Sequence, residues 1–264
     1  MFGLVASPFA MIETFVAFVL ALILHNCAQA LMAAALGDRT PVNKGRFSFL
    51  PGAHLSAIGV IVAIVTSISA VCGLGWGKPV ETDAPRLRPG PNLGIIIVAL
   101  TGIITNLVIG LGIAFGLKFL PGVPALGRAF AECSTQVAQV GNPLLMCMNK
   151  AQPADLPPAY LLYIMQFLIA FAVTNVGLAL LNIIPLYPLD GYYILFAILP
   201  SGPAITYRNT IQYMELILLL ILFLIPYLLQ ILRIGFDPAL IIGNLARSLV
   251  FRVGSPAFSY YLAL

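Results

Sequence analysis

Charged residues are scarce in this chain. Of its 264 residues only 8% are charged, while 61% are hydrophobic and the mean hydropathy is +1.03. An ordinary soluble domain carries about 25% charged residues, so a water-soluble chain of this length would lack the charge to cover its surface. We therefore expect an integral membrane protein whose main solvent is lipid.

Runs of basic residues are missing as well. The thirteen basic and nine acidic residues stand singly along the chain, and the net charge is +4. Nucleic-acid binding needs clustered Lys and Arg, so we expect no nucleic-acid partner. A small positive excess is ordinary for membrane loops. Because the two loops that flank the second expected span are equally basic, the charge pattern leaves the membrane orientation open.

The four cysteines show no CxxC spacing. Cys27 and Cys72 lie in apolar runs, where a free thiol packs as a small hydrophobic group. Cys133 and Cys147 share one loop and could pair outside the cytosol, but the sequence does not decide whether they do.

Apolar runs of the length that crosses a bilayer, about 20 residues, recur along the chain. They cover approximately residues 8–36, 55–74, 93–120, 159–184 and 214–232, and a further short or amphipathic segment covers approximately 238–251. Between the first two runs, residues 37–53 contain the alternation Phe47-Ser48-Phe49, which predicts a small amphipathic β-hairpin. No repeat or linker divides the chain. We expect an all-α integral membrane protein with about five or six transmembrane helices, forming a single domain over residues 1–264.

Two groups of polar residues stand inside or beside these apolar runs. His25 and Gln29 are four residues apart, so on a helix they share one face. Asp190 and Gly191 follow Pro185 and Pro188, which end the fourth run because neither fits inside a regular helix. Ionisable groups at such depth are candidates for function. On pattern alone, however, a hydrogen-bonded histidine and an ordinary Asp-Gly turn explain these residues too.

A resemblance to a known family adds to this pattern. The run from Phe18 to Leu31, continued by Ala35-Leu36-Gly37-Asp38, is similar to the zinc-motif helix of the site-2 proteases. Further similar motifs follow in the family's order, namely Gly45 to Phe49, His54, Gly75 to Val80, Thr101 to Leu107 and, most closely, Asn175 to Gly191. The chain thus resembles intramembrane zinc metalloproteases over its first 200 or so residues.

The resemblance implies a damaged site. His25 would be the first zinc ligand and Asp190 the third, but Gln29 stands where the second ligand histidine belongs. Asn26 stands where the family has the glutamate that acts as general base. Catalytic zinc needs three protein ligands and an open position, and an asparagine amide does not take up a proton at neutral pH. We therefore predict no catalytic residue, and if any metal site survives, His25 and Asp190 are its ligands, with Gln29 and His54 as weaker candidates.

Three hypotheses follow. The first is a catalytically inactive pseudoprotease that binds a transmembrane partner or serves as a structural subunit of a larger membrane complex, with no cofactor. The second is an active zinc metalloprotease with an unusual ligand set, and the third is a transporter or proton path. Few charged residues lie in the spans, which weighs against the third. The resemblance implies the bacterial inner membrane, and the residues that would bind a partner stay unassigned.

Overall fold

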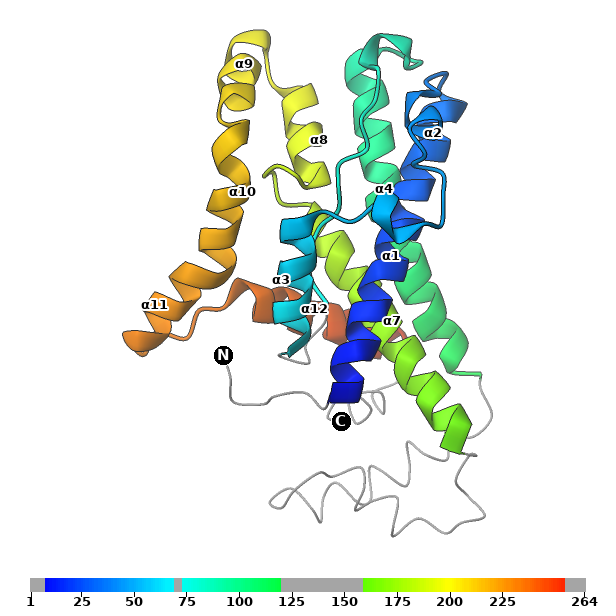
Figure 1. Ribbon diagram of the computed structural model, residues 1–264, viewed down its shortest axis with the longest axis vertical. Helices are drawn as coiled ribbons and strands as arrows, with labels where there is room; N and C mark the ends of the chain where they lie inside the picture. Colours follow the sequence, from blue (N-terminus) through cyan, green and yellow to red (C-terminus); the bar gives the residue numbers. More distant parts are fainter. Residues whose placement is uncertain (1–7, 69–72, 120–158, 255–264) are drawn as a thin grey trace.

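Three long helices form the centre of the molecule in a computed structural model that describes residues 8–68, 73–119 and 159–254. They are α1 (Pro8–Ala35), α4 (Pro91–Leu117) and α7 (Ala159–Asn182), and each packs against the other two (Figure 1). α7 is the most enclosed of the three, since 72% of its most apolar 18-residue stretch is buried inside the protein. The predicted first, third and fourth spans are confirmed as helices.

Close contact between these helices depends on small residues. Gly110 of α4 lies so near α7 that a Cβ built on it would come within 2.7 Å of the carbonyl oxygen of Ala172 and of Cγ2 of Val176. A glycine here lets the two backbones approach, as small residues do in membrane helix pairs. Gly112, two residues on, faces open space.

The remaining helices of the described residues are shorter. They are α2 (Thr40–Asn43), η1 (Pro51–Ala53), α3 (Ala57–Ile68), η2 (Ala84–Arg86), α8 (Asp190–Ile198), α9 (Ser201–Asn209), α10 (Ile211–Leu219), the π-helical η3 (Leu220–Leu224), α11 (Ile225–Ile231) and α12 (Pro238–Val253). Figure 1 shows α12 crossing one end of the bundle, where it packs against α7 and α4.

The predicted fifth span is confirmed, but it is not a uniform helix. α10, η3 and α11 run on continuously, and the π-turn comes immediately before Pro226. Proline lacks an amide hydrogen and its ring collides with the preceding turn, so the helix widens locally. This span is the least enclosed of the four candidate spans, since 22% of its most apolar 18-residue stretch is buried.

The predicted second span is not confirmed as a spanning helix. Among the described residues of this run only α3 is helical, and its 12 residues cover about 18 Å, whereas the hydrocarbon layer is about 30 Å thick. After α3 the chain returns beside it in extended form. Thr66 Oγ1 bonds to the amide and the carbonyl of Leu74 at 2.9 and 2.8 Å, and Leu55 forms an antiparallel bridge with Gly77. We call α3 and residues 73–77 the re-entrant hairpin.

The predicted β-hairpin in residues 37–53 is also wrong. The segment forms turns, α2 and η1, and the described residues contain no strand beyond the isolated bridge between Leu55 and Gly77. Proline starts both helices. The carbonyl of Ser48 accepts from His54 Nε2 at 2.7 Å and from Cys27 Sγ at 3.5 Å, so it is not used in a strand ladder. Hydrogen bonds to side chains replaced the expected backbone pairing.

Four helical spans in the described residues are therefore long and apolar enough to cross a membrane, within 8–35, 91–117, 163–182 and 213–231. This is fewer than the five or six predicted, because residues 55–74 do not form a spanning helix. The chain is an integral membrane protein by these four spans. Cys133 and Cys147, whose pairing the sequence left open, lie outside the described residues.

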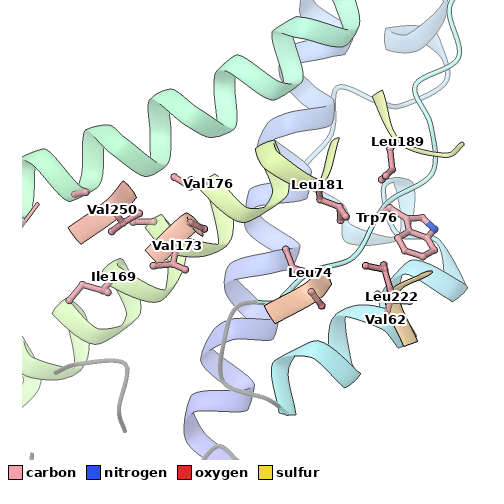
Figure 2. Close-up of a cluster of buried hydrophobic side chains, with 14 of the residues drawn as sticks. Val62, Leu74, Trp76, Ile169, Val173, Val176, Leu181, Leu189, Leu222 and Val250 are labelled. Atoms are coloured by element: carbon pink, nitrogen blue, oxygen red, sulfur yellow. The ribbon is translucent and has the colours of Figure 1, made fainter. Parts of the chain in front are cut away.

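A buried apolar cluster joins the re-entrant hairpin to the last span. Figure 2 shows Val62 and Trp76 next to Leu222. Trp76 also donates a hydrogen bond from Nε1 to Glu215 Oε1 at 2.9 Å. The extended backbone of residues 73–77 is thus covered by protein, which is the condition under which non-helical backbone is tolerated at membrane depth.

Candidate functional site: a polar cluster between three helices

α1 carries two buried polar side chains on the face that meets α4. His25 and Gln29 are 4% and 3% exposed, and their four-residue spacing stacks them on successive turns. Gly102 of α4 lies against both, because a Cβ on it would come within 2.4 Å of His25 Nε2 and 2.7 Å of Gln29 Nε2. The missing side chain of Gly102 therefore provides the space that the two polar groups occupy.

Asp190 reaches this face from the other side. α7 ends at Asn182, the chain turns through Pro185 and Pro188, and α8 begins at Asp190 itself. The next residue is Gly191, where a Cβ would lie 2.3 Å from the carbonyl oxygen of Ile183. Only a glycine permits this close return, which leaves the Asp190 carboxylate buried between the helices.

The three side chains meet. Gln29 Nε2 donates to Asp190 Oδ1 at 2.7 Å, and His25 Nε2 lies 2.9 Å from Asp190 Oδ2. Asn106 of α4 completes the group, with its Nδ2 lying 3.2 Å from His25 Nδ1. We call His25, Gln29, Asn106 and Asp190 the polar cluster. It links α1, α4 and α8.

His25 has a polar neighbour at each ring nitrogen. Nδ1 lies 3.2 Å from the Asn106 amide, and Nε2 lies 2.9 Å from Asp190 Oδ2. That oxygen has no partner with hydrogen-bond geometry among the described residues, whereas Oδ1 accepts from Gln29.

Asn26, beside His25, has a different environment. It is 4% exposed, and its Nδ2 has no hydrogen-bond partner within the described parts of the chain. By the resemblance of this helix to the zinc-motif helix of the site-2 proteases, the general base of the family is expected at this position. The group found here is an amide, which is neutral and does not take up a proton.

His54 does not join the polar cluster. It is fully buried, and its Nε2 contacts the carbonyl oxygen of Ser48. Burial lowers the pKa of His54, helped by the nearby charge of Arg46 and opposed by the hydrogen bond to Ser48. Across residues 8–68, 73–119 and 159–254, no three His, Cys, Asp or Glu side chains gather as a metal site. The structure therefore does not assemble the predicted alternative of His25, His54 and Asp190.

Asn106 and Gly102 were missed as site residues. Both lie in the run from Thr101 to Leu107, which is one of the sequence motifs similar to the site-2 proteases. The available signal was Asn106 itself, since a fully buried amide within an apolar span needs a polar partner.

The sequence profile of Peptidase family M50 matches residues 13–224. The chain belongs to Peptidase family M50. This is the site-2 protease family of zinc metalloproteases, and the match includes α1, α4, α7 and α8. A protein of Bacillus subtilis (strain 168) named "Putative zinc metalloprotease YwhC" is 27% identical over 219 residues, which cover 83% of this chain and 81% of that protein. No solved structure matches the chain.

The zinc of family M50 does not fit the donor set found here. Catalytic zinc takes three protein ligands with available lone pairs. In the polar cluster Gln29 turns its NH₂ group toward Asp190 Oδ1, and an amide nitrogen that donates a hydrogen has no lone pair for a metal. His25 and the Asp190 carboxylate are then the two donors left in the cluster, one fewer than catalytic zinc takes.

Proposed function

We propose that this M50 member is a pseudoprotease, a membrane protein that keeps the protease fold but does not hydrolyse peptides. The observation that carries the proposal is the hydrogen bond from Gln29 Nε2 to Asp190 Oδ1 at 2.7 Å. In this contact Gln29, expected from the resemblance at the second ligand position, is a hydrogen-bond donor toward Asp190, expected at the third. A group that donates an N–H does not coordinate a metal through the same atom.

The general-base position supports the same conclusion independently. A positioned base contributes about 10²–10⁴-fold to a rate, and Asn26 offers none at neutral pH. Even a chain that bound zinc would therefore hydrolyse peptides poorly with Asn26 in place. The loss of ligand and base together is what separates this chain from a protease with one weakened residue.

For the biological role, we propose binding to a transmembrane segment of a partner protein, or a structural place in a larger membrane complex. The fold supports this, because the described residues contain four candidate membrane spans whose central helices pack closely against one another. We place the protein in the bacterial inner membrane, in line with the bacterial origin of its relative. Bound lipid and a membrane partner are expected, and a resident cofactor is not.

An active zinc protease with an unusual ligand set is the second candidate. One observation favours it, because His25 and Asp190 still meet, with 2.9 Å between Nε2 and Oδ2. For Gln29 to complete such a site, its amide would have to turn by 180° and present Oε1, which breaks its hydrogen bond to Asp190. The missing base at Asn26 would remain.

Zinc content and cleavage, measured together, separate the two candidates. The protein is purified in mild detergent without chelator, beside Asp190→Ala and the double variant Asn26→Glu/Gln29→His. We expect no stoichiometric zinc and no cleavage of a transmembrane peptide substrate for the wild type. The double variant should bind about one zinc per chain, because it regains three ligands. About one zinc in the wild type, with cleavage that Asp190→Ala abolishes, would refute the pseudoprotease proposal.

Partner binding needs its own test. A photo-reactive amino acid replaces Tyr193, a half-buried residue of α8 near Asp190, and as a control it replaces Phe119, which is 72% exposed beyond the far end of α4. Irradiation of native membranes should give, from position 193 and not from 119, a product whose cross-linked peptide maps to a transmembrane segment of another protein. Equal products from both positions would contradict binding at the former active site.

A further inference from the structure

We infer that Gln29 and His25 replace the metal structurally: they hold Asp190, and with it the start of α8, against α1 and α4 without any ion. The inference goes beyond the proposed function, because it concerns what keeps the site closed. It rests on that proposal only in requiring a metal-free site. Gln29 is in this view a positioning residue retained for its N–H group.

The first argument is the way in which α8 is attached. α8 has nine residues and follows a turn that contains Pro185 and Pro188. The helix before this turn ends at Asn182, and Asn182 Oδ1 lies 3.4 Å from the amide of Asp190, which is a long contact. Gln29 and His25 of α1 both make short polar contacts with the Asp190 side chain, at 2.7 and 2.9 Å, and these contacts join the start of α8 to α1.

The second argument is the charge of Asp190. A carboxylate that is 8% exposed between membrane helices is tolerated only when its oxygens are hydrogen-bonded or its charge is compensated. In a zinc site the cation provides that compensation. Here Oδ1 accepts a hydrogen bond from Gln29, and the His25 ring lies against Oδ2 with 2.9 Å between Nε2 and Oδ2. Oδ2 has no partner with hydrogen-bond geometry among the described residues, so the neutral amide of Gln29 is the group that satisfies the carboxylate without an ion.

The third argument is the support behind His25. Asn106 is fully buried, and its amide lies 3.2 Å from His25 Nδ1. This contact fixes the orientation of the imidazole ring, so that Nε2 stays 2.9 Å from Asp190 Oδ2. A group of the protein itself therefore holds the His25 ring against Asp190.

The test is hydrogen exchange of the α8 backbone in the full-length protein, measured with and without chelator. Gln29→Met keeps the side-chain length and removes the N–H donor, and Gln166→Met removes a similarly buried glutamine of α7. We expect residues 190–198 to exchange at least about tenfold faster in Gln29→Met, which corresponds to about 1.4 kcal/mol of local opening. Gln166→Met should leave α8 at the wild-type rate. Chelator should not change the wild type.

A second variant covers the case in which Gln29→Met fails to fold. Gln29→His provides an imidazole beside His25 and Asp190, so added zinc should slow α8 exchange in this variant and chelator should reverse the effect. Faster wild-type exchange in chelator would overturn the metal-free clamp. Unchanged α8 exchange in Gln29→Met would overturn it as well. If α8 exchange is unchanged in Gln29→Met while the wild type is metal-free and inactive, the clamp is refuted but the pseudoprotease proposal stands. The failure of the clamp is thus distinguishable from the failure of the proposed function.

Discussion

Gly102→Ala adds one methyl group at the centre of the polar cluster, and we predict that it destabilises the protein strongly. In a helix, alanine is normally favoured over glycine by up to about 1 kcal/mol. Here the new Cβ would lie 2.4 Å from His25 Nε2 and 2.7 Å from Gln29 Nε2. Because ordinary contacts begin near 3.5 Å, both side-chain ends would have to move by about 1 Å.

The magnitude follows from what that movement breaks. Both atoms are the ones that contact Asp190, at 2.9 and 2.7 Å, so moving them away from Gly102 strains or breaks these contacts. Hydrogen bonds to charged groups contribute about 1.5–3 kcal/mol each, and overpacking costs about 1–3 kcal/mol. With partial relaxation, and after subtracting the helix-propensity gain, we expect a net loss of about 2–4 kcal/mol in the free energy of unfolding.

Gly112→Ala is the matched control, because Gly112 lies on the same helix and nothing approaches its Cβ position within 4 Å. We expect the stability of this variant to stay within about 0.5 kcal/mol of the wild type or to rise slightly. Unfolding by SDS titration in mixed micelles can be followed by the fluorescence of Trp76, the single tryptophan of the chain. If Gly102→Ala proved as stable as Gly112→Ala, the described packing of Gly102 against the polar cluster would be wrong.

Three further predictions concern the re-entrant hairpin and its surroundings. Burial lowers the pKa of His54 in the folded protein. Below the ordinary histidine pKa of about 6.5, the unfolded state therefore binds more protons than the folded state. Stability should therefore fall as the pH drops below about 6.5. Thermal unfolding measured from pH 8 to 5 should show a smaller fall in unfolding temperature for His54→Gln than for the wild type. The same dependence of unfolding temperature on pH in both proteins would contradict this prediction. Thr66→Val removes both bonds to the Leu74 backbone and should cost about 1–3 kcal/mol in the same SDS titration, whereas no change would mean that water replaces them. Trp76→Phe removes the donor to Glu215 and should speed hydrogen exchange in α10, while Glu215→Gln, which keeps an acceptor, should have the smaller effect; the reverse order would argue against this hydrogen bond.

Local features of the sequence were sufficient for membrane insertion and for the main helices. Uninterrupted apolar runs predicted α1, α4 and α7, because lipid leaves a backbone no alternative to internal hydrogen bonding. The spacing of His25 and Gln29 placed both on one face, and the prolines after α7 placed Asp190 at a break. All of these properties are decided within a few residues of the chain.

The tertiary structure decided three features: the path of the second apolar run, the secondary structure of residues 37–53 and the contacts within the polar cluster. Residues 55–74 are apolar enough to span, yet residues 73–77 lie beside α3, where Thr66 bonds to the backbone of Leu74 and Leu55 pairs with Gly77. The hydrogen bond between Gln29 and Asp190 joins residues 161 positions apart, and Asn106 meets His25 across 81 positions. Composition and spacing show which groups are present, but whether an amide donates to a carboxylate or turns toward a metal depends on how three helices pack around it.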